Sequence, residues 1–285
     1  MDKAYWRLER PDYSSDYQDT FINGSGSYPH GLPGINCSVC KKAYGNTYVV
    51  PYTCPEKLVK HKSLLKKWPI PQDEHSVLQK QIKAELEASG IDTTSFPSIY
   101  DFQPVHLKFP SHPKSDFLWS TRAGPIVSAK VKTLFEQHQV TGVKFCPSVI
   151  DKVGKRNSKG PFAIASTGEP EDIIEEVKGE ANPAQFGPLH EMVITSTSGR
   201  PPGAEVTSQC PACGREEFDN SKRVLVLTKA MIPPTDIFLL ATTTSIVVNN
   251  RVRELIWKSK LSNAQVAEFP VQDSGPEQGI IFSKQ

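Results

Sequence analysis

Two Cys-x-x-Cys pairs most constrain how this chain of 285 residues can fold. The first pair is Cys37 and Cys40, and the second is Cys210 and Cys213. Each pair supplies half of a tetrahedral site, and four soft sulfur ligands favour zinc. A compact zinc ribbon has roughly 15–20 residues between its pairs, whereas residues 41–209 separate these two. The spacing therefore predicts one structural zinc site that fastens distant regions of the chain together.

The residue that follows each pair predicts how readily that pair forms a metal-binding turn. Gly214 follows the second pair and permits the left-handed backbone that points amide groups at thiolate sulfur. Lys41 follows the first pair, so this turn is the weaker of the two. A disulfide within either pair and a redox-active pair stay open as alternatives. The redox role needs a cysteine at the start of a helix, and neither pair opens an evident long helix.

The composition is that of an ordinary folded protein with balanced charge. The chain has 33 basic and 31 acidic residues, a formal net charge of +2, and 38% apolar residues. Binding to phosphates needs a clear basic excess, so we expect no nucleic-acid partner. We also expect no membrane span, because no stretch approaches the ~20 apolar residues required. The cysteine usage and the lack of a signal-peptide pattern at the N-terminus predict a cytoplasmic location.

The pattern along the chain predicts an α+β fold with mixed sheets and a few helices. Residues 1–70, rich in aromatic and turn residues, are expected to form an N-terminal zinc-knuckle and β region that packs on the C-terminal half. Residues 71–285 form the predicted α+β body with the second cysteine pair, and one continuous domain is the alternative. The further elements predicted are a basic helix at 56–68, a helix at 76–89, an exposed loop at 151–160, an acidic amphipathic run at 169–180 and a strand at 192–197.

Two segments, 126–147 and 246–270, resemble each other. Each predicts a strand, an amphipathic helix of about three turns and a returning strand. The matched residues share an offset of 121 positions: Val131 with Val252, Leu134 with Leu255, Phe135 with Ile256, and Val140 with Leu261. The two segments are thus predicted to be pseudo-symmetric halves of one α+β domain, with chance similarity as the alternative.

No catalytic motif stands out, so we expect a protein that is not an enzyme and has no catalytic residues. There is no phosphate-binding glycine loop and no nucleophile elbow. The histidines lack the spacing of a catalytic metal centre. His190 could replace one of the cysteine ligands, but four cysteines already complete a closed site. Cys54 and Cys146 each precede a proline, and we expect both to be buried and inert.

The order of these pieces resembles the myxobacterial double-CXXCG paralogous family. Beside the two cysteine pairs, which are the most specific element, the similarity rests on Tyr5–Leu8, Leu32–Gly34, Gly142–Val143, Cys146–Pro147, Gly214–Arg215, Ile232–Phe238 and the unit from Ile246 to Phe269. It covers nearly the whole chain. Lys41 departs from the glycine that the family prefers.

Some members of that family are similar to swarm-incompatibility immunity proteins, which protect a cell against a toxin delivered by its kin. The resemblance implies a non-enzymatic cytoplasmic protein that binds another polypeptide, with a homodimer or a heterodimer with a paralogue as possible assemblies. The alternative is an accessory protein that binds a precursor peptide in natural-product biosynthesis. An enzyme with an unrecognised site is the third hypothesis. Which residues form the binding surface is left open.

Overall fold

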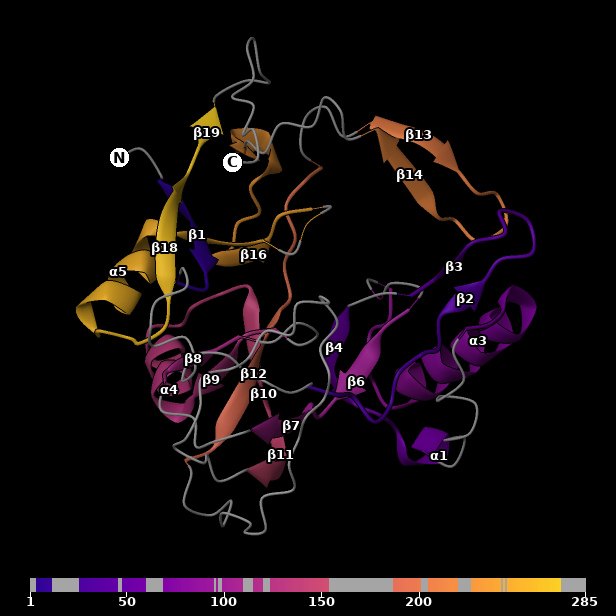
Figure 1. Cartoon of the computed structure of the whole chain (residues 1–285), viewed down its shortest axis with the longest axis horizontal. Coiled ribbons are helices and arrows are strands. Elements are labelled where there is room, and N and C mark those ends of the chain that lie inside the picture. Colours follow the sequence, from indigo (N-terminus) through magenta and orange to yellow (C-terminus); the bar gives the residue numbers. More distant parts are fainter. Residues whose placement is uncertain are drawn as a thin grey trace, which may run out of the picture.

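The computed structural model describes the chain in thirteen stretches and gives it a mixed α+β fold with several small sheets (Figure 1). The predicted fold class is confirmed at this level. The helices are α1 (Glu56–Val59), α3 (Gln72–Ala88), α4 (Ala129–Gln137) and α5 (Asn250–Lys258), with a 3-10 helix at Lys229–Met231. The described residues are 4–11, 26–45, 48–59, 69–94, 96, 99–109, 115–119, 124–153, 187–200, 205–219, 227–241, 243 and 245–272.

The C-terminal sheet has its N-terminal strand in the interior. Its order is β16-β17-β1-β18, and all neighbouring strands are antiparallel. Helix α5 joins β17 to β18 and lies beside the sheet (Figure 1). Because β1 lies between these two strands, the first residues of the chain complete a sheet made by its end. The strands are β16 (Ile237–Leu239), β17 (Ile246–Asn249), β1 (Tyr5–Glu9) and β18 (Gln265–Phe269).

A second sheet repeats this arrangement in the order β8-β9-β12-β10. Helix α4 joins β9 to β10, and β12 lies antiparallel between them as β1 does in the first sheet. The helices begin at Ala129 and Asn250 and end at Gln137 and Lys258, so both ends keep the offset of 121 positions. The strands are β8 (Phe117–Leu118), β9 (Ile126–Ser128), β10 (Val143–Pro147) and β12 (Leu189–Ile194).

We call β8, β9, α4 and β10 the first unit, and β16, β17, α5 and β18 the second unit. After each helix the chain takes the left-handed conformation twice. These residues are Gln139 and Gly142 in the first unit and Lys260 and Asn263 in the second, again 121 positions apart. The two segments that resemble each other in sequence thus share strand order, helix ends and turn conformation.

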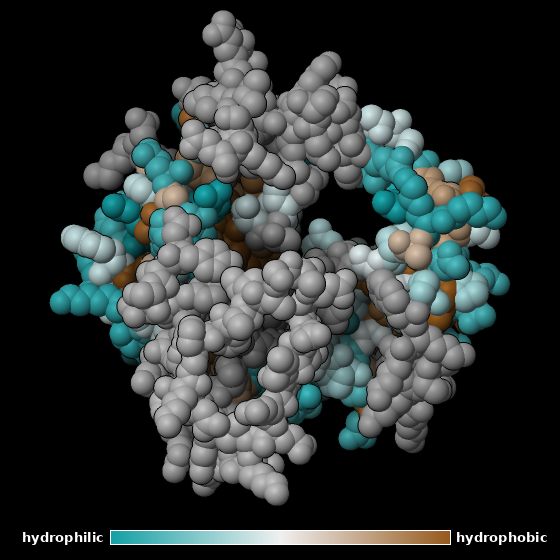
Figure 2. Space-filling model, viewed as in Figure 1, coloured by the Kyte–Doolittle hydropathy of each residue, from teal (hydrophilic) through white to brown (hydrophobic). Residues whose placement is uncertain are grey.

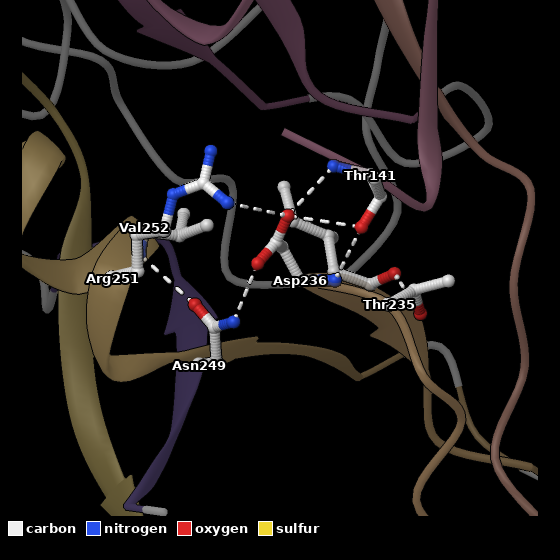
Figure 3. Close-up of polar contacts among 7 residues, drawn as sticks. Thr141, Thr235, Asp236, Asn249, Arg251 and Val252 are labelled. Carbon is white, nitrogen blue, oxygen red and sulfur yellow. Dashed lines mark hydrogen bonds and ion pairs between the residues drawn. The ribbon is translucent and has the colours of Figure 1, made fainter. Parts of the chain in front are cut away.

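The two units are joined by a carboxylate at the start of β16. Asp236 Oδ2 accepts hydrogen bonds from the backbone N and the Oγ1 of Thr141, both at 2.9 Å, from the turn after α4 (Figure 3). Asp236 Oδ1 accepts one from Asn249 Nδ2 at 2.7 Å, and the Arg251 guanidinium lies 3.4 Å from Oδ2. The second unit therefore binds the turn of the first.

The reciprocal contact is built from Asp116, which precedes β8. Asp116 Oδ2 accepts hydrogen bonds from the backbone N and the Oγ of Ser262, at 2.9 and 3.1 Å, from the turn after α5. Its Oδ1 accepts one from Ser128 Oγ at 2.9 Å, and Lys130 Nζ lies 3.4 Å from Oδ2. Ser262, Ser128 and Lys130 stand 121 positions before or after their counterparts in the other contact, so the interface is close to two-fold symmetric.

The N-terminal part forms its own hydrophobic core around α3. The predicted helix at 76–89 is confirmed, but it begins earlier, at Gln72, where acidic residues in the first turn suit the positive end of the helix dipole. Gly90, with φ of 79°, follows its C-terminus as predicted. This core draws residues from both sides of position 70, so the boundary predicted there stays a prediction. The strands here are β2 (Ile35–Asn36), β3 (Ala43–Tyr44), β4 (Val49–Thr53), β5 (Ile70–Pro71) and β6 (Asp101–Gln103).

A buried carboxylate ties the N-terminal part to the second sheet. Glu191 on β12 accepts hydrogen bonds from Tyr28 Oη at 2.5 Å, Gln103 Nε2 at 2.6 Å and the backbone N of Gly124 at 2.8 Å. Burial raises the pKa of Glu191, although all three donors act in the opposite direction. Both of its oxygens thus have hydrogen-bond partners, as buried polar groups usually do.

Short pairs of strands complete the fold. They are β7 (His106–Phe109) with β11 (Val149–Val153), β13 (Glu205–Gln209) with β14 (Glu216–Asp219), and β15 (Leu227–Thr228) with β19 (Val271–Gln272). The start of the loop predicted at 151–160 is therefore strand, because β11 pairs with β7. The rest of that loop, most of the helix predicted at 56–68 and the acidic run at 169–180 lie outside the described residues. Among the described helices, none has the length and apolar character to cross a membrane.

Candidate metal centre

Each cysteine pair lies in the tight turn of a β-hairpin. Strands β2 and β3 enclose Cys37 and Cys40, and β13 and β14 enclose Cys210 and Cys213. The two hairpins meet although they come from opposite halves of the sequence (Figure 1). Figure 2 shows hydrophilic residues along the outer edge of the β13–β14 hairpin and more hydrophobic ones where it reaches the N-terminal part.

The two turns share one backbone geometry. The residue after the second cysteine is left-handed in both, with φ of 58° at Lys41 and 71° at Gly214. Its backbone N donates to the carbonyl of the first cysteine, from Lys41 to Cys37 at 3.0 Å and from Gly214 to Cys210 at 2.8 Å. Lys41 thus takes the conformation that glycine adopts without steric cost. The first turn forms in spite of its lysine.

The four predicted ligands lie together. Their Sγ atoms are all within 4.8 Å of one another, with 3.8 Å between Cys37 and Cys210 and 3.9 Å between Cys40 and Cys213. All six cysteines of the chain are free thiols, so neither pair forms a disulfide in this structure. Both pairs lie in hairpin turns, not at the start of a helix as the redox alternative requires. The arrangement could hold one metal ion.

Backbone amides prepare two of the thiols for ligation. The NH groups of Cys213 and of the residue before it lower the pKa of Cys210 to about 6. The NH of Cys40 is the main cause that lowers the pKa of Cys37. At Cys40 itself the NH of Lys42 acts in the same direction, but burial and the neighbouring sulfurs outweigh it and raise the pKa to about 11. A metal ion would replace the remaining protons, because it binds thiolates.

Two side chains of the N-terminal part connect the turns. Gln72, the first residue of α3, has Oε1 3.2 Å from Cys37 Sγ, and its Nε2 donates to the carbonyl of Ala212. Tyr44 Oη donates to the carbonyl of Cys213 at 3.0 Å. The sequence patterns gave no indication of either role, because each contact joins segments far apart in the chain. Such outer contacts orient the ligands of a metal site.

Both cysteine hairpins carry basic residues next to the cysteines. Four thiolates around a divalent ion carry a net charge of −2, which nearby cations stabilise. Lys42 Nζ forms an ion pair with Glu217 of the other hairpin, and the Arg215 guanidinium lies over the Tyr44 ring at 5.6 Å. Both cations are therefore placed by contacts within or between the hairpins.

The other predicted residues do not belong to the centre. Cys54 and Cys146 are buried as expected, and burial raises the pKa of each thiol to about 11. Their inertness stays a prediction. His190 lies on β12 opposite Pro147 and is not part of the four-residue group.

The four cysteines pack in or against the N-terminal core and would give a metal ion four protein ligands. A metal with four protein ligands has no open position for substrate, so this arrangement can stabilise structure but cannot activate a bound water in the usual way. A comparison of the chain with models of known protein families and with curated protein sequences finds no match.

Proposed function

We propose that the four cysteines bind zinc and that the zinc fastens the two hairpins together. A tetrahedral zinc–tetrathiolate site with bonds of about 2.3 Å has sulfur–sulfur edges of about 3.8 Å. The Sγ distances of 3.8 Å between Cys37 and Cys210 and 3.9 Å between Cys40 and Cys213 fit the edges of such a site. The donor set supports this choice of ion, since soft thiolates in tetrahedral geometry favour zinc over magnesium or calcium.

We further propose that the protein is a zinc-stabilised polypeptide-binding protein, of the immunity type that neutralises a cognate toxin. The observation that carries the proposal is the closed four-sulfur centre, which serves a rigid scaffold better than a reaction. The resemblance to the double-CXXCG family supports the immunity role. The near-neutral charge of +2 favours a polypeptide over a nucleic acid.

The zinc part of the proposal is tested by removing the metal. We expect chelation, or Cys210→Ser, to lower the free energy of unfolding by about 3 kcal/mol or more, since metal binding contributes directly to folding. Zinc content and thermal melting should be measured on the same sample. Cys54→Ser is the control and should keep the full metal content. Melting that is unchanged in Cys210→Ser, together with full loss of function, would instead point to a redox or catalytic role for the thiols.

The binding part is tested by affinity capture with the purified products of neighbouring genes. A toxin that is bound and neutralised by the zinc-loaded protein supports the immunity role. Capture of a precursor peptide would move the protein to the accessory role in biosynthesis. If no polypeptide binds, and the protein turns over a small molecule instead, the proposal is wrong.

A further inference from the structure

The β13–β14 hairpin depends on the cysteine centre for its place in the molecule. It forms a two-stranded sheet of its own, and neither strand pairs with any other strand of the described chain. The described side chains of β13, at residues 206–209, are exposed. A two-stranded hairpin without further packing is only marginally stable in water. Figure 1 shows it extending away from the N-terminal part, which it meets at the cysteine turn.

The described contacts between this hairpin and the N-terminal part gather beside the cysteines. The carbonyls of Ala212 and Cys213 accept hydrogen bonds from side chains of the N-terminal part. Glu217, near the start of β14, forms the ion pair with Lys42. The side chains of this pair are 47% and 42% exposed, so the pair adds little to the attachment. A metal ion held by all four cysteines would therefore be the main attachment of the hairpin.

The two cysteine pairs differ in their access to solvent. In the first pair Cys37 is 1% exposed and belongs to the N-terminal hydrophobic core. In the second pair Cys210 and Cys213 are both half-buried and pack against that core from outside. A disulfide needs two thiols that an oxidant can reach, because one thiol is oxidised and the other then attacks it. The second pair is thus the more accessible one.

The second pair can also close a disulfide inside its own turn. Cys210 and Cys213 lie at the two ends of this turn, which the hydrogen bond from the Gly214 backbone N to the Cys210 carbonyl closes at 2.8 Å. Their Sγ atoms lie within 4.8 Å of each other. The Cys-x-x-Cys spacing is the one with which disulfide oxidoreductases form a reversible disulfide. Here the cysteines would be the target of an oxidant and not a catalyst of disulfide exchange.

We propose that the centre is a redox-sensitive clasp, in which hydrogen peroxide joins Cys210 to Cys213, releases the metal ion and detaches the β13–β14 hairpin from the N-terminal part. One thiolate of the pair attacks the peroxide, so that an S–O bond forms, the O–O bond breaks and hydroxide leaves. The other thiolate attacks the sulfenic sulfur, so that the S–S bond forms, the S–O bond breaks and a second hydroxide leaves. The two thiolates lose two electrons, the peroxide gains them, and the hydroxides take up protons from solvent to become water.

The disulfide opens the clasp because it removes two of the four ligands. Zinc would keep only Cys37 and Cys40, whereas a structural site needs four protein ligands. The hairpin would then keep only its hydrogen bonds and the exposed ion pair with the N-terminal part. A thiol reductant would restore the two ligands. This switch rests on the proposed zinc site and works whatever polypeptide the protein binds.

The test uses the full zinc-loaded chain and graded amounts of hydrogen peroxide. A colorimetric indicator follows released zinc, mass spectrometry maps the disulfides, and hydrogen exchange follows the backbone of β13 and β14. We expect zinc release together with a Cys210–Cys213 disulfide. Exchange in the hairpin should become about tenfold faster or more, with exchange in α5 unchanged. Dithiothreitol with added zinc should reverse all three changes.

Two matched variants separate the pairs. Cys213→His and Cys40→His each leave three cysteines and one histidine, a donor set that structural zinc accepts, and each removes the disulfide from one turn. We expect peroxide to release zinc about tenfold more slowly from Cys213→His than from the unchanged chain, and at about the unchanged rate from Cys40→His. If either variant fails to bind zinc, the disulfide mapped in the unchanged chain decides between the pairs.

Several outcomes would overturn the switch and leave the zinc site standing. Zinc that stays bound under peroxide contradicts it, and so does a disulfide confined to Cys37 and Cys40. Disulfides between the two hairpins, with hairpin exchange unchanged, would show that oxidation keeps the clasp closed. Equal protection by the two variants would also contradict the assignment to the second pair. A purified chain that holds no zinc would instead refute the zinc site, and the switch with it.

Discussion

Asp116 and Asp236 hold equivalent places in the two units, and their ionisation is coupled to the fold. Burial alone raises the pKa of each carboxyl, but the hydrogen bonds from the facing turn and from the helix start outweigh it. The pKa of both groups therefore lies below the ordinary value. A lowered pKa in the folded state means that the ionised carboxylates stabilise the interface between the units.

This predicts a specific pH dependence. The stabilisation is complete above the pKa of unfolded aspartate, about 3.9, and is lost as the pH falls through the lower folded value. We expect Asp116→Asn and Asp236→Asn to lower stability at neutral pH and to make it less sensitive to acid. Urea unfolding at a series of pH values measures this. Glu136→Gln on the exposed face of α4 is the control, and an equal acid response in all four proteins would contradict the prediction.

Gly142 and Asn263 make contacts with the opposite unit that the local sequence does not reveal. A Cβ at Gly142 would lie 1.9 Å from the Ile237 carbonyl oxygen, and φ there is 85°. At the equivalent position Asn263 donates to the Phe117 carbonyl at 2.7 Å. The sequence pair Gly and Asn is compatible with a left-handed turn. It gives no sign that each turn touches the other unit.

At the scale of elements, the turns of the two cysteine hairpins share one backbone geometry but differ in the residue after the second cysteine. The Gly214 position has nothing within 4 Å of an added Cβ, so only backbone strain distinguishes glycine from other residues there. Lys41 carries this strain in the first hairpin. The prediction from sequence that the first turn is the weaker one has a physical basis in this φ angle.

Substitution at these positions should change stability in opposite directions. We expect Lys41→Gly to raise the free energy of unfolding of the zinc-loaded protein by about 1 kcal/mol, the cost of a left-handed non-glycine residue. Gly214→Ala should lower it by about the same amount. Chemical unfolding and competition with a zinc indicator measure the two effects. A Lys41→Gly protein with lower zinc affinity would show that the lysine charge matters more than the backbone strain.

The elements themselves were predictable where their pattern is local. Helix α3 buries Leu78, Ile82 and Leu86, spaced four residues apart, and this periodicity is plain in the sequence. The strand–helix–strand pattern at 126–147 and 246–270 is equally local. Strands such as β2 and β3 have two residues each, too few to show a period of two. Strand β3 pairs with β2 across the cysteine turn, and β2 also pairs with β5, which lies further along the chain.

At the scale of the whole molecule, the fold is closed by strands that come from distant sequence. Strand β1 lies inside the C-terminal sheet, and Leu8 on it is 2% exposed in the core shared by both units. The first residues of the chain therefore stabilise its C-terminal part.

We expect Leu8→Ala to lower the free energy of unfolding by about 2–5 kcal/mol, because it leaves a cavity in this shared core. The C-terminal sheet and the second unit should lose stability together, because both pack on this core. Equilibrium unfolding with hydrogen exchange on β17 and β18 measures both effects. Trp257→Ala is the control and should change stability by no more than about 0.5 kcal/mol, since that side chain is exposed. A loss of protection confined to β1 would contradict the shared core.

The sequence by itself determined the features that depend on neighbouring residues: the cysteine turns, the amphipathic helices, the repeated strand–helix–strand pattern and the balance of charge. Apart from the meeting of the two cysteine pairs, which their spacing predicted, tertiary structure alone decided which segments meet. It places β1 and β12 inside the two sheets, Gln72 between the cysteine turns, and Asp116 and Asp236 against the opposite units. The physical reason is that turn geometry and periodicity act over a few residues. The pairing of distant strands and buried polar groups depends on how the whole chain buries its surface and satisfies its hydrogen bonds.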